Sequence, residues 1–172
     1  MKDALLDDAA IERYARQLVV PGIGAAGQRR LLSSCVLVVG EDRGVRQAIL
    51  YLEAAGVRVT RDAAAAATAD VVLVAGNLAG QERAAVLRAP APLCWYVLDE
   101  QGFTSGVHPG CSLPAAAEAG ARGGNADHDR HDDARHDAAA CDAAALACAV
   151  LLGLARDPGP ARFVLPEALR DA

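Results

Sequence analysis

The sequence predicts an α/β fold in which a doubly wound, mostly parallel sheet is flanked by helices. The run from Cys35 to Val39 is apolar on both faces and ends at Gly40, as expected of a buried parallel strand. From Val45 to Ala55 the apolar residues recur at helical spacing, and strands then alternate with a helix as far as residue 98. This strand, helix, strand order with right-handed crossovers is Rossmann-like.

Residues 1–34 are predicted to form the N-terminal helices. Helical spacing runs from 8 to 34, and Asp8 is a suitable N-cap for its start. Pro21 and Gly22 break the stretch, so two short helices are expected.

The α/β core is assigned to residues 35–113. The first core helix is followed by Gly56, the residue type that suits a helix C-terminus. Apolar runs bounded by Gly and Pro then predict a strand at 57–60, a strand at 71–74, a short helix at 80–88 and a strand at 93–98.

The remainder of the chain changes character twice. Residues 114–137 are rich in Asp, His and Arg and contain nothing that could pack a core, which predicts a mobile polar loop. Residues 138–172 are predicted to close the fold with a helix at 138–154 and a strand at 162–165. The 172 residues are therefore expected to form a single domain.

Composition and charge argue against two classes of partner. The net charge of -5 and the pI of 5.3 leave no broad basic surface for a nucleic acid. No apolar run reaches the roughly 18 residues of a membrane span, and the N-terminus, MKDALLDDAA, is acidic where a signal peptide is basic and then apolar. We therefore expect a cytoplasmic protein that binds neither nucleic acid nor membrane.

The cysteines are odd in number and have no framework spacing, so reduced thiols are expected. They are Cys35, Cys94, Cys111, Cys141 and Cys148. Cys-x-x-Cys pairs are absent, and structural zinc is therefore not predicted.

Two polar features have both a chemical and a structural interpretation. Cys111 has His108 close in sequence and could act as a nucleophile if the imidazole reached it, but a small hydrophobe in a turn is the preferred interpretation. A cluster of imidazoles and carboxylates could collect a transition metal, yet its spacing obeys no ligand rule, so a solvated loop is preferred and no metal site is predicted. The cluster comprises Asp127, His128, Asp129, His131, Asp132, Asp133, His136 and Asp137.

The segment ERYARQL at residues 12–18 carries a specific resemblance. It is followed by Pro21, Gly24, Gly27-Gln28 and Leu31-Leu32. This pattern resembles the opening of the ThiF/MoeB/HesA family, which reads R-Y-x-R-Q with a downstream G-x-x-G-Q and L-L. The resemblance covers residues 12–57 without a gap and is looser downstream, and it implies the fold of a ubiquitin-activating-like adenylyltransferase.

The loop after the first strand departs from the family pattern. The family has roughly G-x-G-G-L-G, in which glycines let backbone amides approach a phosphate, whereas this chain has Gly40-Glu41-Asp42-Arg43-Gly44-Val45. Side chains replace three of the glycines, and the carboxylates of Glu41 and Asp42 oppose a polyphosphate. The family's acidic ribose-binding residue and its Asn-Arg-Gln stretch are missing after the second strand, and its later Asp-Asn is replaced by Gly76-Asn77. We therefore expect no bound ATP or other cofactor.

Arg16 matches the second arginine of R-Y-x-R-Q, which in the family is thought to reach the phosphates of the neighbouring subunit. The resemblance thus implies a non-adenylating partner, in a homo- or heterodimer, of an active ThiF-like subunit that acts on a ubiquitin-like or peptide substrate, with Arg16 contributed in trans. Arg13 and Arg16 could instead be solvated helix residues. Two other functions stay open, a module that binds a leader peptide or carrier protein and a genuine adenylyltransferase with an atypical phosphate loop.

Overall fold

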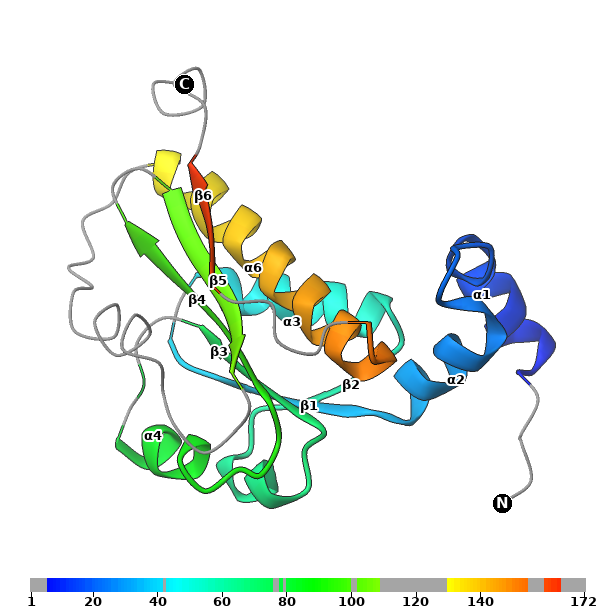
Figure 1. Cartoon of the computed structure of the whole chain (residues 1–172), viewed down its shortest axis with the longest axis horizontal. Helices are drawn as coiled ribbons and strands as arrows, with labels where there is room; N and C mark the ends of the chain where they lie inside the picture. The colour runs from blue at the N-terminus through cyan, green and yellow to red at the C-terminus, as the bar shows by residue number, and fades with distance from the viewer. Residues whose placement is uncertain are drawn as a thin grey trace.

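In the computed structural model two N-terminal helices are followed by strands and helices that alternate as far as β4 (Figure 1). The structure describes residues 6–41, 43–75, 78, 80–99, 102–108, 130–154 and 160–164. The elements in chain order are α1 (Asp8–Leu18), α2 (Gly24–Ser33), β1 (Cys35–Val39), α3 (Gly44–Ala54), β2 (Arg58–Thr60), the 3-10 helix η1 (Ala63–Ala67), β3 (Val71–Ala75), α4 (Gly80–Val86), β4 (Leu93–Asp99), β5 (Gly102–His108), α6 (Arg130–Leu152) and β6 (Ala161–Val164).

The strands form one six-stranded sheet in the order β2-β1-β3-β4-β5-β6. The first four strands in this order, β2, β1, β3 and β4, pair in parallel, and β5 is antiparallel to both β4 and β6. The predicted α/β class, Rossmann-like with a mostly parallel sheet, is confirmed.

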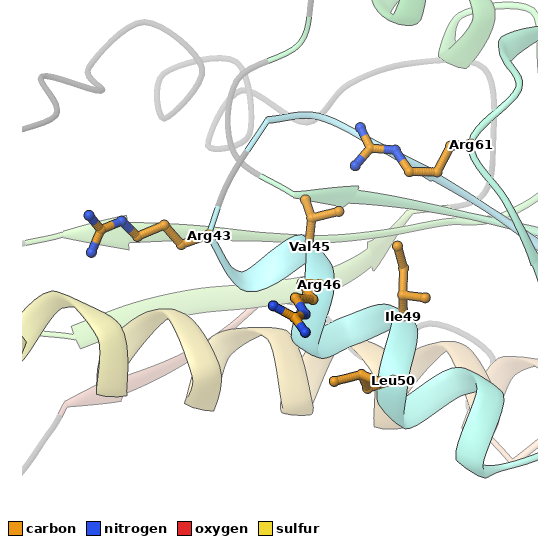
Figure 2. A pocket seen from close by; sticks show the side chains of 6 residues that line it. All are labelled: Arg43, Val45, Arg46, Ile49, Leu50 and Arg61. Atoms are coloured by element: carbon orange, nitrogen blue, oxygen red, sulfur yellow. The ribbon is translucent and has the colours of Figure 1, made fainter.

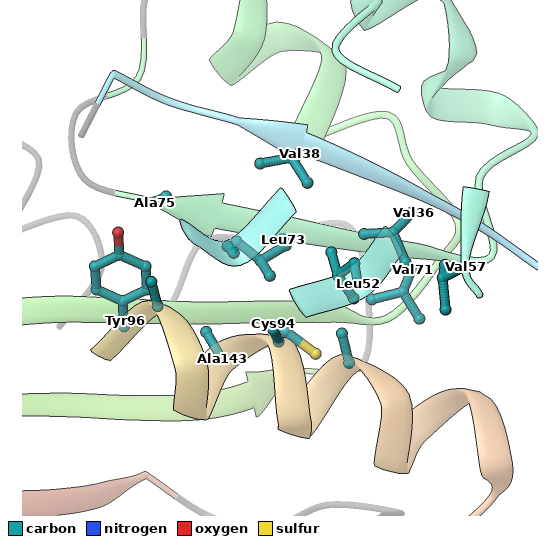
Figure 3. Close-up of a cluster of buried hydrophobic side chains, with 14 of the residues drawn as sticks. Val36, Val38, Leu52, Val57, Val71, Leu73, Ala75, Cys94, Tyr96 and Ala143 are labelled. Atoms are coloured by element: carbon teal, nitrogen blue, oxygen red, sulfur yellow. The ribbon is translucent and has the colours of Figure 1, made fainter. Parts of the chain in front are cut away.

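Successive residues of the central strands face two separate cores. In β1, Val36 and Val38 belong to the core under α3 and α6, whereas Leu37 and Val39 belong to the core under η1 and α4. Figure 3 shows the first of these cores, in which Cys94 and Tyr96 of β4 lie beside Ala143 of α6. Helices therefore cover both faces of the sheet, which explains why β1 and β3 are buried along their whole length.

The helix α6 approaches the sheet closely because its inner face is made of alanine. The alanines at 139, 140, 143, 144 and 147 are at most 2% exposed. Small side chains at these positions let α6 pack against α3 and β4 at short range.

The N-terminal helices are present, with one correction to their start. The N-cap of α1 is Asp7 rather than the predicted Asp8, and Asp7 Oδ1 accepts a hydrogen bond of 2.7 Å from the amide of Ala10. In Figure 1, α1 and α2 extend from one end of the molecule, beyond the sheet.

The strand β5 is an element that the sequence does not predict. Gly102 and Gly106 interrupt the alternation of side chains in this strand, so its periodicity is weak. The structure gives Gly106 a packing role, because it pairs with Trp95 and a Cβ there would lie 3.0 Å from the Cζ2 atom of that indole. The hairpin of β4 and β5 therefore depends on a contact between strands that a single segment does not reveal.

The predicted mobile loop at 114–137 is wrong in its last part, because α6 begins at Arg130. Once the alanine-rich part of α6 is packed, each residue added before it extends an existing helix and avoids the unfavourable nucleation step. Polar residues are tolerated at this end of the helix, as the exposed side chain of Asp137 illustrates. Residues 109–129 lie outside the described part of the chain.

Among the described residues, no helix is both long enough and apolar enough to cross a bilayer.

Candidate functional site

The carboxyl ends of β1, β2 and β3 meet at one edge of the sheet, the place where α/β proteins bind ligands. Gly40 follows β1, Arg61 follows β2, and Glu82 lies in α4, the helix after β3. Gly40 is buried and has a φ of 106°, in the region that favours glycine. The sheet edge and the loop motif therefore place the candidate nucleotide site at Gly40.

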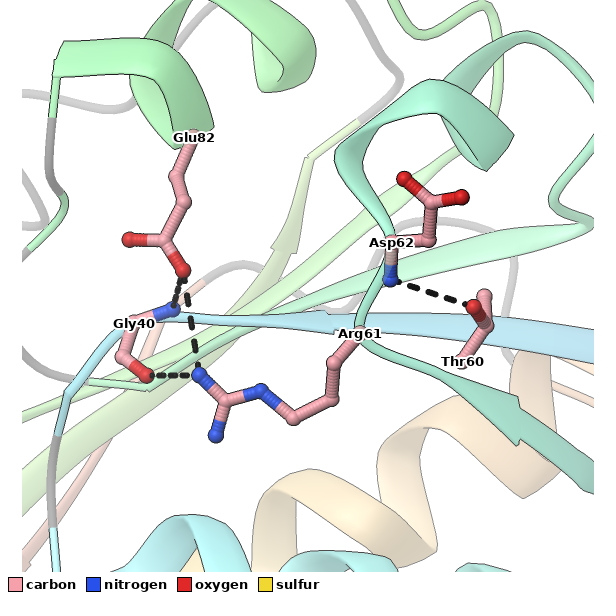
Figure 4. Close-up of polar contacts among 5 residues, drawn as sticks. All are labelled: Gly40, Thr60, Arg61, Asp62 and Glu82. Atoms are coloured by element: carbon pink, nitrogen blue, oxygen red, sulfur yellow. Dashed lines mark hydrogen bonds and ion pairs between the residues drawn. The ribbon is translucent and has the colours of Figure 1, made fainter.

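Two side chains bind the backbone of Gly40 (Figure 4). The amide of Gly40 donates a hydrogen bond of 3.1 Å to Glu82 Oε1. Arg61 Nη2 donates a hydrogen bond of 2.8 Å to the carbonyl oxygen of Gly40 and lies 3.8 Å from Glu82 Oε1. The carboxylate of Glu82 thus occupies the position at the Gly40 amide that a phosphate oxygen would need.

The arrangement opposes a second anion on energetic grounds. A charge-assisted hydrogen bond contributes about 1.5–3 kcal/mol, and a phosphate at the Gly40 amide would have to replace one. A phosphate charge roughly 4 Å from the carboxylate would be repelled by about 4 kcal/mol at an effective dielectric constant of roughly 20. Arg61 offsets only part of this repulsion because Gly40 and Glu82 already engage its guanidinium.

Sequence reasoning missed both Glu82 and Arg61. The signal available was their position, since each follows a parallel strand at the edge of the sheet where ligands bind. Of the loop residues that the sequence singles out, Glu41 and Arg43 are exposed. Asp42, Gly76 and Asn77 lie outside the described residues.

The loop leads into a tightly packed helix start at Gly44. A Cβ at Gly44 would lie 2.6 Å from the hydroxyl of Tyr96, 2.8 Å from the backbone oxygen of His136 and 3.0 Å from Cβ of Ala140. The first turn of α3 is therefore pressed against α6 and β4 and has no spare room on that side.

The N-terminal motif is largely structural. Gln17 Nε2 donates to the carbonyl of Ala54 at 3.1 Å, and Gln28 Nε2 donates to the carbonyl of Ala55 at 2.9 Å. Tyr14 is buried, and its hydroxyl would lie 2.9 Å from a Cβ placed on Gly56. The two glutamines therefore donate hydrogen bonds to carbonyl groups at the end of α3, which have no partner within the helix, and the tyrosine packs against the residue that follows.

The two arginines of the motif, Arg13 and Arg16, are exposed and make no hydrogen bond to the last turn of α3. The guanidinium of Arg13 lies 5.6 Å from the centroid of the Tyr14 ring. Arg16 is exposed on α1 and makes no hydrogen bond or ion pair with any described residue.

The thiols of Cys94 and Cys148 are not poised as nucleophiles. Burial, and secondarily the neighbouring Cys148, raises the pKa of Cys94 to about 12, and burial raises the pKa of Cys148 to about 11. The reactive thiolate is therefore scarce at neutral pH.

These shifts predict a loss of stability in alkali. Thiols of the unfolded chain ionise near their ordinary pKa of 9.0, whereas the folded thiols keep their protons up to about 11 and about 12. The free energy of unfolding should fall above about pH 9, by at most about 1.4 kcal/mol per pH unit for each thiol. Urea denaturation between about pH 8 and pH 10 measures the slope. A Cys94→Ala, Cys148→Ala double variant should lose this part of the slope, and equal slopes in the two proteins would contradict the assignment.

The other chemical candidates fall partly outside the described residues. Cys111, the proposed partner of His108, lies there, as do Asp127, His128 and Asp129. In the part of the chain that the structure describes, no three His, Cys, Asp or Glu side chains are grouped as metal ligands would be.

Comparison with known proteins locates the similarity in a short segment. No family model matches the chain. It is 42% identical over 57 residues to "Adenylyltransferase and sulfurtransferase MOCS3" from Dictyostelium discoideum, which is 33% of this chain and 13% of that protein. It is 46% identical over 52 residues both to "Protein HesA, vegetative" from Trichormus variabilis and to "SAMP-activating enzyme E1" from Haloferax volcanii, covering 30% of this chain and 20% and 19% of theirs. The matched segment thus spans no more than a fifth of these relatives.

The similarity of the fold is more extensive. The crystal structure of selenomethionine PaaA superimposes with a TM-score of 0.63 over 91% of this chain and 69% of that one, at 12% sequence identity. At this identity the comparison concerns the fold alone.

Proposed function

We propose that this chain, which belongs to the ThiF/MoeB/HesA family, is a subunit that does not adenylate by itself and assists an active ThiF-like partner in the cytoplasm. The relatives with which it shares its matched segment include proteins named as adenylyltransferases. A partner with an intact phosphate loop would supply the adenylation chemistry.

The proposal that this chain does not adenylate by itself depends on one observation, the hydrogen bond from the Gly40 amide to Glu82. Phosphate loops bind anions through backbone amides that have no other acceptor. In this chain an internal carboxylate already accepts from the first amide of the loop, and Arg61 holds that carboxylate and the Gly40 carbonyl in place. This arrangement supports a loop that has lost its affinity for a triphosphate.

The proposal that this chain assists an active partner depends on Arg16. Arginine binds phosphate oxygens through a planar fork, and an arginine supplied in trans can stabilise the charge that develops during phosphoryl chemistry. The contacts of Tyr14, Gln17 and Gln28 hold the N-terminal helices against the end of α3. Arg16 therefore projects from a helix that is bonded to the rest of the fold. The exposed guanidinium without a partner in the described chain supports this role.

Calorimetric titration with ATP and magnesium tests the loss of nucleotide affinity. We expect no binding by the purified chain at ATP concentrations up to about 1 mM. A relative that keeps the G-x-G-G-L-G loop serves as the positive control under the same conditions. Micromolar affinity, or ATP–pyrophosphate exchange by this chain on its own, would mean that it is an adenylyltransferase with an atypical loop.

A further inference from the structure

An open hollow of about 300 Å³ lies beside the first turns of α3. Its lining side chains, drawn in Figure 2, come from the N-cap and first two turns of α3 and from the segment after β2, and they are Arg43, Val45, Arg46, Ile49, Leu50 and Arg61. None of the described residues that line the hollow is acidic. Its volume is at the lower end of the range for ligand pockets.

The charged side chains among the described residues that line the hollow are arginines, in a protein of net charge -5, and Glu82, 3.8 Å from Arg61, offsets part of their charge. Arg46 is exposed and makes no hydrogen bond or ion pair with a described residue. Arg61 is held by its hydrogen bond to Gly40 and pairs with Glu82, and its side chain is still 45% exposed, so further N–H groups of its guanidinium remain for a ligand. A guanidinium that is held in place loses less entropy when it binds a carboxylate.

The other three lining residues of the hollow are apolar. Val45 is 5% exposed, Ile49 is half-buried, and Leu50 is 50% exposed. The exposed part of Leu50 offers a contact surface for an apolar side chain of a ligand. The hollow therefore combines two arginines, Arg46 on α3 and Arg61 after β2, with apolar side chains of α3.

We propose that this hollow binds a polypeptide segment in which carboxylate side chains alternate with apolar ones. A nucleotide fits the observations less well, because no described lining residue is aromatic and able to stack on a base, and because Glu82 holds the adjacent Gly40 amide. The proposal does not depend on the role of Arg16. That residue lies on α1, which is bonded to the opposite end of α3 through Gln17 and Ala54.

Fluorescence anisotropy with a short fluorescein-labelled peptide of alternating glutamate and leucine tests the proposal. We expect saturable binding that weakens as salt is raised, because exposed charges are screened. The Arg46→Glu variant should bind at least about tenfold more weakly, since it replaces a carboxylate-binding group with a like charge. A glutamate in the first turn of α3 also suits the helix dipole, so this variant should fold.

Arg88→Glu is the matched control. Arg88 is exposed and follows α4, which packs under the other face of the sheet. Replacing Arg88 with glutamate changes the net charge by the same amount as Arg46→Glu, but at a position away from the hollow. We expect its affinity for the peptide to equal that of the wild type. Equal losses in the two variants, no binding of the peptide at about 1 mM protein, or equally tight binding of a lysine and leucine peptide would each overturn the proposal. So would tighter binding of ATP that depends on Arg46, because the occupant would then be a nucleotide.

Discussion

Replacing Arg16 with alanine is expected to slow the adenylation activity of the assembled pair by at least about a hundredfold. Arg16 stands exposed on α1 without a partner in the described chain, and a guanidinium that contacts a phosphate only during reaction contributes to the rate rather than to folding. The measurement is ATP–pyrophosphate exchange by the ThiF-like chain that co-purifies with this one, with wild-type or variant protein added back. Thermal unfolding of the variant chain alone should be unchanged.

Two further variants make this result specific. Arg16→Lys keeps the charge but loses the planar fork, so it should recover only part of the rate. Arg88→Ala removes an exposed arginine from the far side of the sheet and should leave the rate unchanged. The trans role is wrong if Arg16→Ala turns over ATP as fast as wild type in the pair, or if no chain with an intact phosphate loop associates with this protein.

Replacing Gly44 with alanine is expected to destabilise the fold by about 2 kcal/mol. In a helix this substitution ordinarily stabilises by about 0.5–1 kcal/mol, so the sign itself is informative. The new Cβ would stand 2.8 Å from the backbone oxygen of His136 and 2.6 Å from the hydroxyl of Tyr96, and a backbone atom cannot move aside without shifting α6. Urea denaturation followed by circular dichroism gives the difference in free energy of unfolding.

Gly27→Ala is the appropriate comparison for Gly44→Ala. Its Cβ would lie 2.9 Å from Cδ2 of Leu152, the far end of a flexible side chain, so this contact can relax. We expect Gly27→Ala to be within about 0.5 kcal/mol of wild type because the helix preference of alanine offsets the contact. Similar changes in the two variants would show that α3 and α6 have more freedom near the loop than the packing at Gly44 indicates.

The regular elements with strong local patterns could be predicted from the sequence. The strands β1 and β3 are continuous apolar runs, and burial on both faces of a parallel sheet requires such runs. Gly56 was expected to end the first core helix, and its φ of 90° is the conformation that this position requires. In these places the residues of one segment are sufficient to specify its structure.

Elements whose stability depends on distant contacts were harder to predict. The strand β5 contains two glycines and gains its stability from pairing with β4, where Trp95 covers Gly106. The first turns of α6 are polar, and they are helical because the alanines that follow are packed against α3 and the sheet. Neither contact is visible in the local pattern.

The candidate site divides in the same way. The R-Y-x-R-Q segment and the altered loop after β1 indicated the resemblance to the ThiF/MoeB/HesA family and the expectation of an impaired phosphate site, because both are short patterns of contiguous residues. The occupation of the Gly40 amide by Glu82 depends on residues 42 positions apart, and Arg61 joins them from a third segment. Parallel strands bring their carboxyl ends together only when the sheet is assembled, so contacts between the segments that follow them are a property of the folded chain.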